Sequence, residues 1–174
     1  MELFWYFIVY SFLGFLLEVA FARAIRAEKQ DRKCFLMLPL CPVYGLGALA
    51  IVLLPEWVRR SGPLLILTGG LAATAVEYVM ALLYEKGMRV AFWDYSQLRF
   101  NIRGRVCLLF SLFWGVLAWG LVTWVHPWIA LVVNRMPLPL SVSVMLLLAA
   151  DSVSTVTLLR RPGSTQSLRW YLRG

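Results

Sequence analysis

Apolar runs of about twenty residues recur along this chain and constrain its fold more than any other feature. Each run is long enough to cross a hydrocarbon core roughly 30 Å thick as a helix. The runs cover residues 3–22, 35–54, 63–84, 106–128 and 140–159. The 174-residue sequence is 61% hydrophobic and only 15% charged, whereas soluble domains are about a quarter charged. We therefore expect an all-α polytopic transmembrane bundle of about five spans, with one domain over residues 1–161 and a short cytoplasmic tail at 162–174.

The second run is irregular. Pro39 and Pro42 interrupt its start, and Gly45 and Gly47 follow directly. Because proline removes an N–H and restricts the preceding residue, the regular helix should begin near Pro42. The break is either a simple kink or the start of a discontinuous helix whose amino-terminal end, near residues 42–45, points into a pocket. The first run carries Glu18 and lacks a basic leader, so we interpret it as a retained helix rather than a signal peptide.

The basic residues indicate the orientation of the spans. With five spans, the first loop, the third loop and the tail share one side and hold five, five and four basic residues. The second and fourth loops lie on the side of the amino terminus and together hold three. Because basic loops remain in the cytoplasm, we predict a bacterial inner-membrane protein with its amino terminus outside and its carboxyl terminus in the cytoplasm. An aromatic belt then places Trp5, Trp57 and Trp128 at the outer interface and Trp93 at the inner one.

The net charge of +8 therefore belongs to loops that meet anionic lipid headgroups. No nucleic-acid-binding motif accompanies this charge, so we expect no nucleic-acid partner. Cys34, Cys41 and Cys107 have no metal-binding spacing, and His126 is the one histidine in the sequence. We expect neither a metal site nor a cofactor.

Three carboxylates, Glu18, Glu77 and Asp151, fall inside the apolar runs, in their predicted cytoplasmic half. In each of these three runs, small and polar residues lie on the same helical face as the carboxylate. The fourth apolar run has a similar face without a carboxylate. Lipid offers polar atoms no partner, so such faces belong at helix contacts or around a cavity. The faces are Ser11, Gly14, Glu18 and Ala22; Gly70, Ala73, Thr74, Glu77, Ala81 and Tyr84; Cys107, Ser111, Trp114, Gly115 and Ala118; and Leu147, Asp151, Ser154 and Thr155.

The densest group of polar and aromatic side chains is F-W-D-Y-S-Q-L-R-F-N-I-R-G-R at residues 92–105, between the third and fourth runs. Together with the buried carboxylates it predicts a polar, cytoplasm-facing pocket. The candidate binding residues are Glu18, Tyr44, Glu77, Trp93, Asp94, Tyr95, Ser96, Asn101, Arg103 and Arg105. Two helix amino termini and two arginines favour an anionic ligand, whereas the carboxylates favour a cation or a proton. The sequence does not decide whether the ligand is negatively or positively charged.

A plainer interpretation makes the same residues structural. Glu18 and Glu77 would then pair with Arg103 and Arg105 and hold the loop against the bundle. For Asp151, near the interface, we favour a structural role. The faces of small residues would serve packing first, and Trp114 and Trp119 would face lipid or fill space between helices.

Several of these motifs resemble the putative ABC-transporter permease (CmpB-like) family of small bacterial membrane proteins. The matching pieces are F-L-G-F-L-L-E at residues 12–18, L-C-P-V-Y-G-L-G-A at 40–48, Glu77-Tyr78, and W-D-Y-S, F-N-I-R-G-R-V-C and S-L-F-W-G within 93–115. The resemblance covers about the first 125 residues, and Leu98-Arg99 departs from it where a proline is expected. It implies a transport permease. Because the chain has no G-x-x-x-x-G-K-[ST] motif, the resemblance implies a separate ATPase subunit that docks on residues 84–105.

Three functions follow from these patterns. In the first, the protein is a transport or substrate-binding membrane subunit, with Glu18 and Glu77 contacting a small-molecule or lipid ligand or a proton, and Arg103 and Arg105 as counter-charges. In the second, it is a membrane-embedded enzyme acting on a lipid or lipid-linked substrate through Asp94, Tyr95, Asn101 and Arg105. The sequence contains no nucleophile–base pair, so this ranks lower. In the third, it is a non-catalytic scaffold that grips another membrane protein. The oligomeric state is not predicted.

Overall fold

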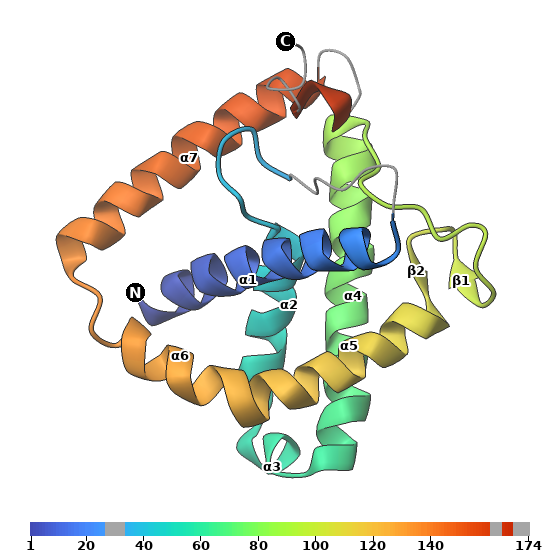
Figure 1. Cartoon of the computed structure of the whole chain (residues 1–174), viewed down its shortest axis with the longest axis vertical. Helices are drawn as coiled ribbons and strands as arrows, with labels where there is room; N and C mark the ends of the chain where they lie inside the picture. Colours follow the sequence, from blue (N-terminus) through green and yellow to red (C-terminus); the bar gives the residue numbers. More distant parts are fainter. Residues whose placement is uncertain (27–33, 161–164, 169–174) are drawn as a thin grey trace.

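The computed structural model describes residues 1–26, 34–160 and 165–168, and the chain is mostly helical there (Figure 1). In chain order the elements are α1 (Glu2–Ala24), α2 (Pro42–Val52), α3 (Glu56–Arg59), α4 (Gly62–Met88), β1 (Asn101–Ile102), β2 (Val106–Cys107), α5 (Leu108–Gly120), the π-helical turn η1 (Leu121–Val125), α6 (His126–Val133), α7 (Leu138–Arg160) and the 3₁₀ turn η2 (Thr165–Leu168). Most of the predicted tail and the basic residues Lys29, Arg32, Lys33, Arg161, Arg169 and Arg173 lie outside the described residues.

Four helical segments are long and apolar enough to cross a membrane. α1 has 23 residues, α4 has 27, the continuous run Leu108–Val133 has 26 and α7 has 23. At 1.5 Å per residue the shortest of them reaches about 34 Å, which exceeds a hydrocarbon core of roughly 30 Å. α2 has only 11 residues and reaches about 16 Å. The membrane class is therefore confirmed, and the count of five spans stays a prediction.

The break before α2 lies where the prolines predict it. α2 begins at Pro42, whose fixed φ suits a first helical turn and whose missing N–H needs no partner there. The preceding residues 34–41 are not helical, so their backbone needs other partners. Asp151 of α7 accepts hydrogen bonds from the N–H groups of Met37 and Leu38, at 3.2 and 2.7 Å, and Thr155 Oγ1 accepts one from Leu36 at 2.9 Å. The structural role predicted for Asp151 is confirmed.

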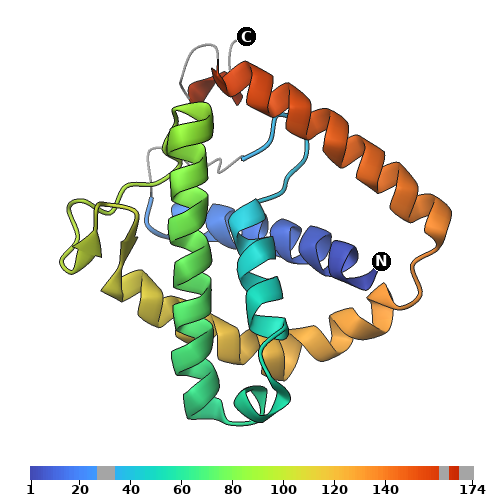
Figure 2. The ribbon, with the colours of Figure 1, turned by 180° about the vertical axis from the view of Figure 1, so that it is seen from behind.

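The helices do not form a simple parallel bundle (Figures 1 and 2). α2 and α4 lie side by side, and α1 crosses them at a steep angle. α5 packs against α4 and crosses it, and η1 and α6 continue α5 as one bent rod to the amino-terminal half of α1. α7 then returns to the carboxyl-terminal end of α4, where Arg160 Nε donates to the Gly87 carbonyl at 3.0 Å.

Small residues allow the close approach of the inner helices. A Cβ placed on Gly70 of α4 would lie 3.2 Å from the backbone of Gly115 of α5, and one on Gly115 would lie 2.6 Å from the Ile66 carbonyl oxygen. Gly14 of α1 faces the Tyr44 ring of α2 so closely that any side chain would overlap the ring. The predicted faces of the first, third and fourth apolar runs are therefore confirmed as packing surfaces.

Two predicted surfaces differ in the structure. On α7, Asp151 and Thr155 are buried, but Leu147 and Ser154 are exposed, so the inner face of this helix is narrower than predicted. Trp57 and Trp128 are exposed, as a membrane-interface belt requires. Trp5, in contrast, is buried against α7, where its indole N–H donates to Ser141 Oγ at 2.8 Å, so it does not face lipid, and its depth at the outer interface stays a prediction.

The residues between α4 and α5 correct the all-α expectation in one place. We call residues 89–107 the hairpin segment, because β1 and β2 pair antiparallel with Asn101 opposite Cys107 and Ile102 opposite Val106. Gly104 has a φ of +70°, a left-handed conformation that glycine adopts readily, and its N–H donates to Asn101 Oδ1 at 2.9 Å. Strands of two residues are too short for an alternating sequence pattern to reveal them.

Candidate functional site

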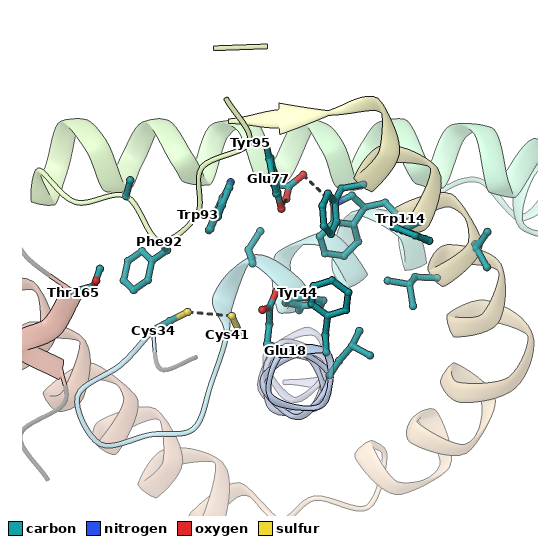
Figure 3. A pocket seen from close by; sticks show the side chains of 18 of the residues that line it. Glu18, Cys34, Cys41, Tyr44, Glu77, Phe92, Trp93, Tyr95, Trp114 and Thr165 are labelled. Carbon is teal, nitrogen blue, oxygen red and sulfur yellow. Dashed lines mark hydrogen bonds between the residues drawn. The ribbon is translucent and has the colours of Figure 1, made fainter. Parts of the chain in front are cut away.

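A cavity of about 380 Å³ lies among α1, α2, α4, α5 and the start of the hairpin segment (Figure 3). Its volume falls in the range of small-molecule sites. Among the described residues, its wall consists of Leu17, Glu18, Phe21, Cys34, Cys41, Val43, Tyr44, Glu77, Ala91, Phe92, Trp93, Tyr95, Phe110, Phe113, Trp114, Val116, Leu117, Thr165 and Leu168. The wall is thus mainly apolar and aromatic with two carboxylates, and it is less polar than the pocket that the sequence predicts.

Glu77 of α4 lies in this wall with only 4% of its surface exposed (Figure 3). Its two oxygens accept hydrogen bonds from neutral groups: Tyr95 Oη donates to Oε1 at 3.0 Å, and Trp114 Nε1 donates to Oε2 at 3.0 Å. Within the described part of the chain, no lysine or arginine forms an ion pair with it. A buried carboxylate with neutral donors alone is unusual, because a buried charge is normally paired.

Glu18 of α1 is the second carboxylate of the cavity wall. Tyr44 Oη of α2 donates to Glu18 Oε1 at 2.8 Å, and the Tyr44 ring lies 5.0 Å from the Trp114 ring, centroid to centroid. The close approach of α1 and α2 at Gly14 fixes the Tyr44 ring in this position. Tyr44 and Trp114 therefore connect the two carboxylates through a continuous aromatic contact.

Tyr95 brings the hairpin segment into the cavity wall. Its N–H donates to the Gly104 carbonyl at 2.8 Å, and its ring stacks on Phe110 of α5 with centroids 4.8 Å apart. Burial raises the pKa of the Tyr95 phenol well above its usual value, and the nearby charge of Glu77 raises it further. Tyr95 consequently keeps its proton and acts as a hydrogen-bond donor to Glu77.

Cys34 and Cys41 also line the cavity, with their sulfur atoms 3.1 Å apart. The Cys41 N–H donates to the Ser11 carbonyl at 2.9 Å, which ties this end of residues 34–41 to α1. Across residues 1–26, 34–160 and 165–168, no group of three or more metal-ligating side chains occurs.

Several predicted site residues stabilise the hairpin segment instead of lining the cavity. Asp94 accepts hydrogen bonds from Ser96 N at 2.8 Å and Ser96 Oγ at 3.0 Å, and both side chains are exposed. Asn101 Nδ2 donates to the Leu98 carbonyl at 2.7 Å. These hydrogen bonds lie within the loop, so Asp94, Ser96 and Asn101 stabilise its conformation.

Arg105 anchors the hairpin segment to α4. Its guanidinium forms an ion pair with Glu85 at 2.6 Å and lies 5.5 Å from the centre of the Tyr78 ring. The bond to Glu85 raises the pKa of Arg105 further above its already high value, so this pair stays charged. The Arg105 carbonyl also accepts a hydrogen bond from Trp93 Nε1 at 2.8 Å.

The predicted pairing of Glu18 and Glu77 with Arg103 and Arg105 is therefore wrong. Arg105 reaches Glu85, which lies about two turns beyond Glu77 on α4, because the hairpin segment directs it there. Arg103 is exposed near the hairpin tip and forms no ion pair within the described ranges.

The comparison with known families decides the class of the protein. The family model described as "Putative ABC-transporter type IV" matches residues 5–157. The chain belongs to this family. The match extends beyond the first 125 residues into α7, so the last span belongs to the family as well. No curated protein and no solved structure matches the chain.

Membership of the ABC-transporter type IV family, together with four candidate spans, makes this chain a multi-pass membrane protein related to transport. Association with other transporter subunits and with membrane lipids agrees with this class. Of the ten candidate residues, the cavity brings together Glu18, Tyr44, Glu77, Trp93 and Tyr95. The remaining five, Asp94, Ser96, Asn101, Arg103 and Arg105, lie outside its wall.

Several residues of the cavity wall, Trp114 among them, are absent from the predicted binding set. Of the two positions expected for Trp114, facing lipid or filling space between helices, the structure shows the second: Trp114 is only 8% exposed and donates to Glu77. Trp119 packs on Trp124 at 4.7 Å between centroids. Trp114 shares a face with Gly115 and Ala118, and this periodicity was the available signal. Asp94, Tyr95, Asn101 and Arg105, the group considered for a lipid enzyme, bind four separate partners and do not converge on one point.

Proposed function

We propose that this protein is the membrane subunit of an ABC-type transporter and that the cavity binds its substrate. The observation that carries the proposal is Glu77, a buried carboxylate whose only described donors are two neutral side chains of the cavity wall. An ionisable residue inside a membrane-spanning helix is costly, and Glu77, unlike Asp151, accepts no hydrogen bond from a non-helical backbone segment, so we infer a functional role for it. The family match to ABC transporters supports transport as that function.

The substrate would enter the cavity from the cytoplasmic side. The predicted orientation rests on five spans, which put the first loop, the third loop and the tail on one side, and on the excess of basic residues there. In that orientation the hairpin segment is cytoplasmic, and its residues Trp93 and Tyr95 in the cavity wall connect the cavity with that side.

The energy for transport would come from a separate ATPase subunit, because the sequence has no phosphate-binding G-x-x-x-x-G-K-[ST] motif. We propose that this subunit docks on the tip of the hairpin segment. Phe100 and Ile102 there are 78% and 59% exposed, and the basic Arg99 and Arg103 flank them. An exposed apolar pair between charges is typical of a protein interface.

Co-purification tests this function. The protein would be extracted from its own membrane in a mild detergent and analysed by native mass spectrometry. We expect a complex with a nucleotide-binding subunit, and we expect Phe100→Ser to dissociate it. Trp57→Ser removes an equally exposed aromatic residue at α3 and serves as the matched control. A chain that never carries an ATPase, although it is extracted folded, would contradict the proposal.

A further inference from the structure

In the sequence, carboxylates and arginines near the predicted pocket favour ligands of opposite charge. The structure places the carboxylates in the cavity wall and the arginines outside it. Glu18 and Glu77 line the cavity, whereas Arg105 is bound to Glu85 and Arg103 lies exposed near the hairpin tip. Among the described wall residues there is no lysine or arginine. We propose that the cavity binds a lipophilic organic cation, such as an aromatic amine or a quaternary ammonium compound, with its positive group beside Glu77. This inference rests on the function proposed above, because it names the substrate class of that site.

Glu77 supplies the negative charge of the proposed site. Each of its oxygens accepts one hydrogen bond, from Tyr95 or from Trp114, and a carboxylate oxygen can accept a second. Both donors are neutral, so they satisfy hydrogen bonding without balancing the charge. Leaving a buried charge without an opposite charge is strongly unfavourable. A cation in the cavity would supply the opposite charge at this point.

The aromatic side chains of the wall also favour an organic cation. Tyr44 and Trp114 form one aromatic pair, and Tyr95 and Phe110 form another. One member of each pair, Trp114 or Tyr95, donates to the Glu77 carboxylate. Aromatic ring faces attract organic cations, most strongly where water is excluded. The aliphatic residues Leu17, Val43, Val116 and Leu117 complete the wall and would contact the apolar part of the ligand.

An anionic ligand is the alternative that this geometry disfavours. The amino terminus of α2 borders the cavity, and a helix terminus carries about half a positive charge. Its first residue is Pro42, which has no N–H, and the Cys41 N–H is already bound to the Ser11 carbonyl. In its ionised form the Glu77 carboxylate outweighs the partial charge of the helix terminus, and a bound phosphate or carboxylate would be repelled.

Probes of matched shape and different charge test the proposal directly. Labelled benzyltrimethylammonium would be bound to the full chain in lipid nanodiscs and displaced by three unlabelled compounds. These are the same cation, the neutral isostere neopentylbenzene and the anion benzylphosphonate, with empty nanodiscs correcting for partition into lipid. We expect the cation to displace the label at least about tenfold more effectively than the neutral isostere, and the anion not to compete.

Variants assign this preference to the cavity. Glu77→Gln should weaken binding of the cation by about tenfold, whereas Glu56→Gln, which removes an equally charged but exposed group, should leave it unchanged. Ala91→Trp, at an exposed position of the wall, should block all binding without disturbing the core.

The outcomes distinguish the two proposals. If the anion competes better, or if Glu77→Gln binds the cation as tightly as wild type, the cation proposal fails. The transport function would still stand if Ala91→Trp abolishes that binding. If no probe binds wild-type protein, the cation proposal also fails, and co-purification of an ATPase decides the function separately.

Discussion

Glu77 and Asp151 are both buried carboxylates on long apolar helices, at 4% and 5% exposure, yet their partners differ in kind. Asp151 accepts hydrogen bonds from the backbone N–H groups of Met37 and Leu38 and from the Thr155 hydroxyl. Glu77 accepts from two side chains, Tyr95 and Trp114, that line a cavity. Asp151 satisfies the backbone of a non-helical segment, whereas Glu77 faces a cavity that a ligand can occupy.

This difference indicates how a structural carboxylate can be told from a functional one in a membrane protein. The non-helical residues 34–41 would leave backbone N–H groups without partners, and Asp151 satisfies them. No such deficit exists around Glu77, because Tyr95 and Trp114 could be replaced by apolar side chains without exposing any backbone group. Burying Glu77 is therefore costly and satisfies no backbone group, and a binding role explains why a carboxylate is present there.

The largest effect on stability is expected at Asp151. Asp151→Ala removes the acceptor for two backbone N–H groups and should lower the free energy of unfolding by about 2–4 kcal/mol. Denaturation of the purified protein in detergent, followed by circular dichroism, would measure this change. Ser154→Ala on the same helix, where the hydroxyl is exposed and bonds its own helix at Ala150, should change little. An equal effect of both variants would remove the structural role of Asp151.

A smaller effect is expected at Trp114. Trp114→Phe keeps an aromatic ring against Tyr44 but removes one of the two donors to Glu77, which should reduce stability by about 1–2 kcal/mol. The same denaturation measurement applies. Trp124→Phe, at an exposed tryptophan, is the control and should stay within about 0.5 kcal/mol of wild type. A loss no greater than that of the control would show that the indole N–H does not support Glu77.

The anchor of the hairpin segment should affect local opening rather than global stability. Arg105→Gln breaks the ion pair with Glu85, so trypsin should cleave after the exposed Arg99 and Arg103 several-fold faster. Limited proteolysis followed by mass spectrometry reports these sites. Glu85→Gln should accelerate cleavage to a similar extent, and the double variant should be no faster than either. Additive acceleration would mean that the two residues act independently.

The smallest effect on stability is expected at Glu77 itself. In Glu77→Gln the amide oxygen can accept one hydrogen bond, and the Tyr95 hydroxyl can rotate to accept one from the amide nitrogen. We therefore expect the free energy of unfolding to change by less than about 0.5 kcal/mol, although cation binding is weakened about tenfold. Denaturation of this variant beside Asp151→Ala would reveal the contrast, and a loss as large as that of Asp151→Ala would make Glu77 structural.

The local features of the fold could be predicted from the sequence because they depend on short stretches of chain. The apolar runs locate the long helices, and Pro42 locates the start of α2. The small-residue face of α4 predicts the burial of Glu77, because residues three and four apart share a side of a helix. These signals need no knowledge of the path of the chain between elements.

The partners of the charged residues could not be predicted in the same way. Glu77 and Glu85 lie on the same helix, and the choice of Arg105 between them depends on a turn with positive φ at Phe100 and Arg103. Asn101 and Gly104 indicate a turn, but they do not tell which carboxylate of α4 Arg105 will reach. The bond between Asp151 and Leu38 joins residues 113 positions apart and likewise arises only from the tertiary arrangement.

The central claim, that the cavity around Glu77 is the ligand site, is tested most directly by protection of cysteines. Cys34 and Cys41 line the cavity, whereas Cys107 is buried outside its wall. Alkylation by iodoacetamide, followed by peptide mass spectrometry, would be timed with and without benzyltrimethylammonium. We predict that the cation slows alkylation of Cys34 and Cys41 in wild type but not in Glu77→Gln, and leaves Cys107 unchanged. Bound cation that protects neither cavity cysteine, or equal protection in Glu77→Gln, would contradict the claim.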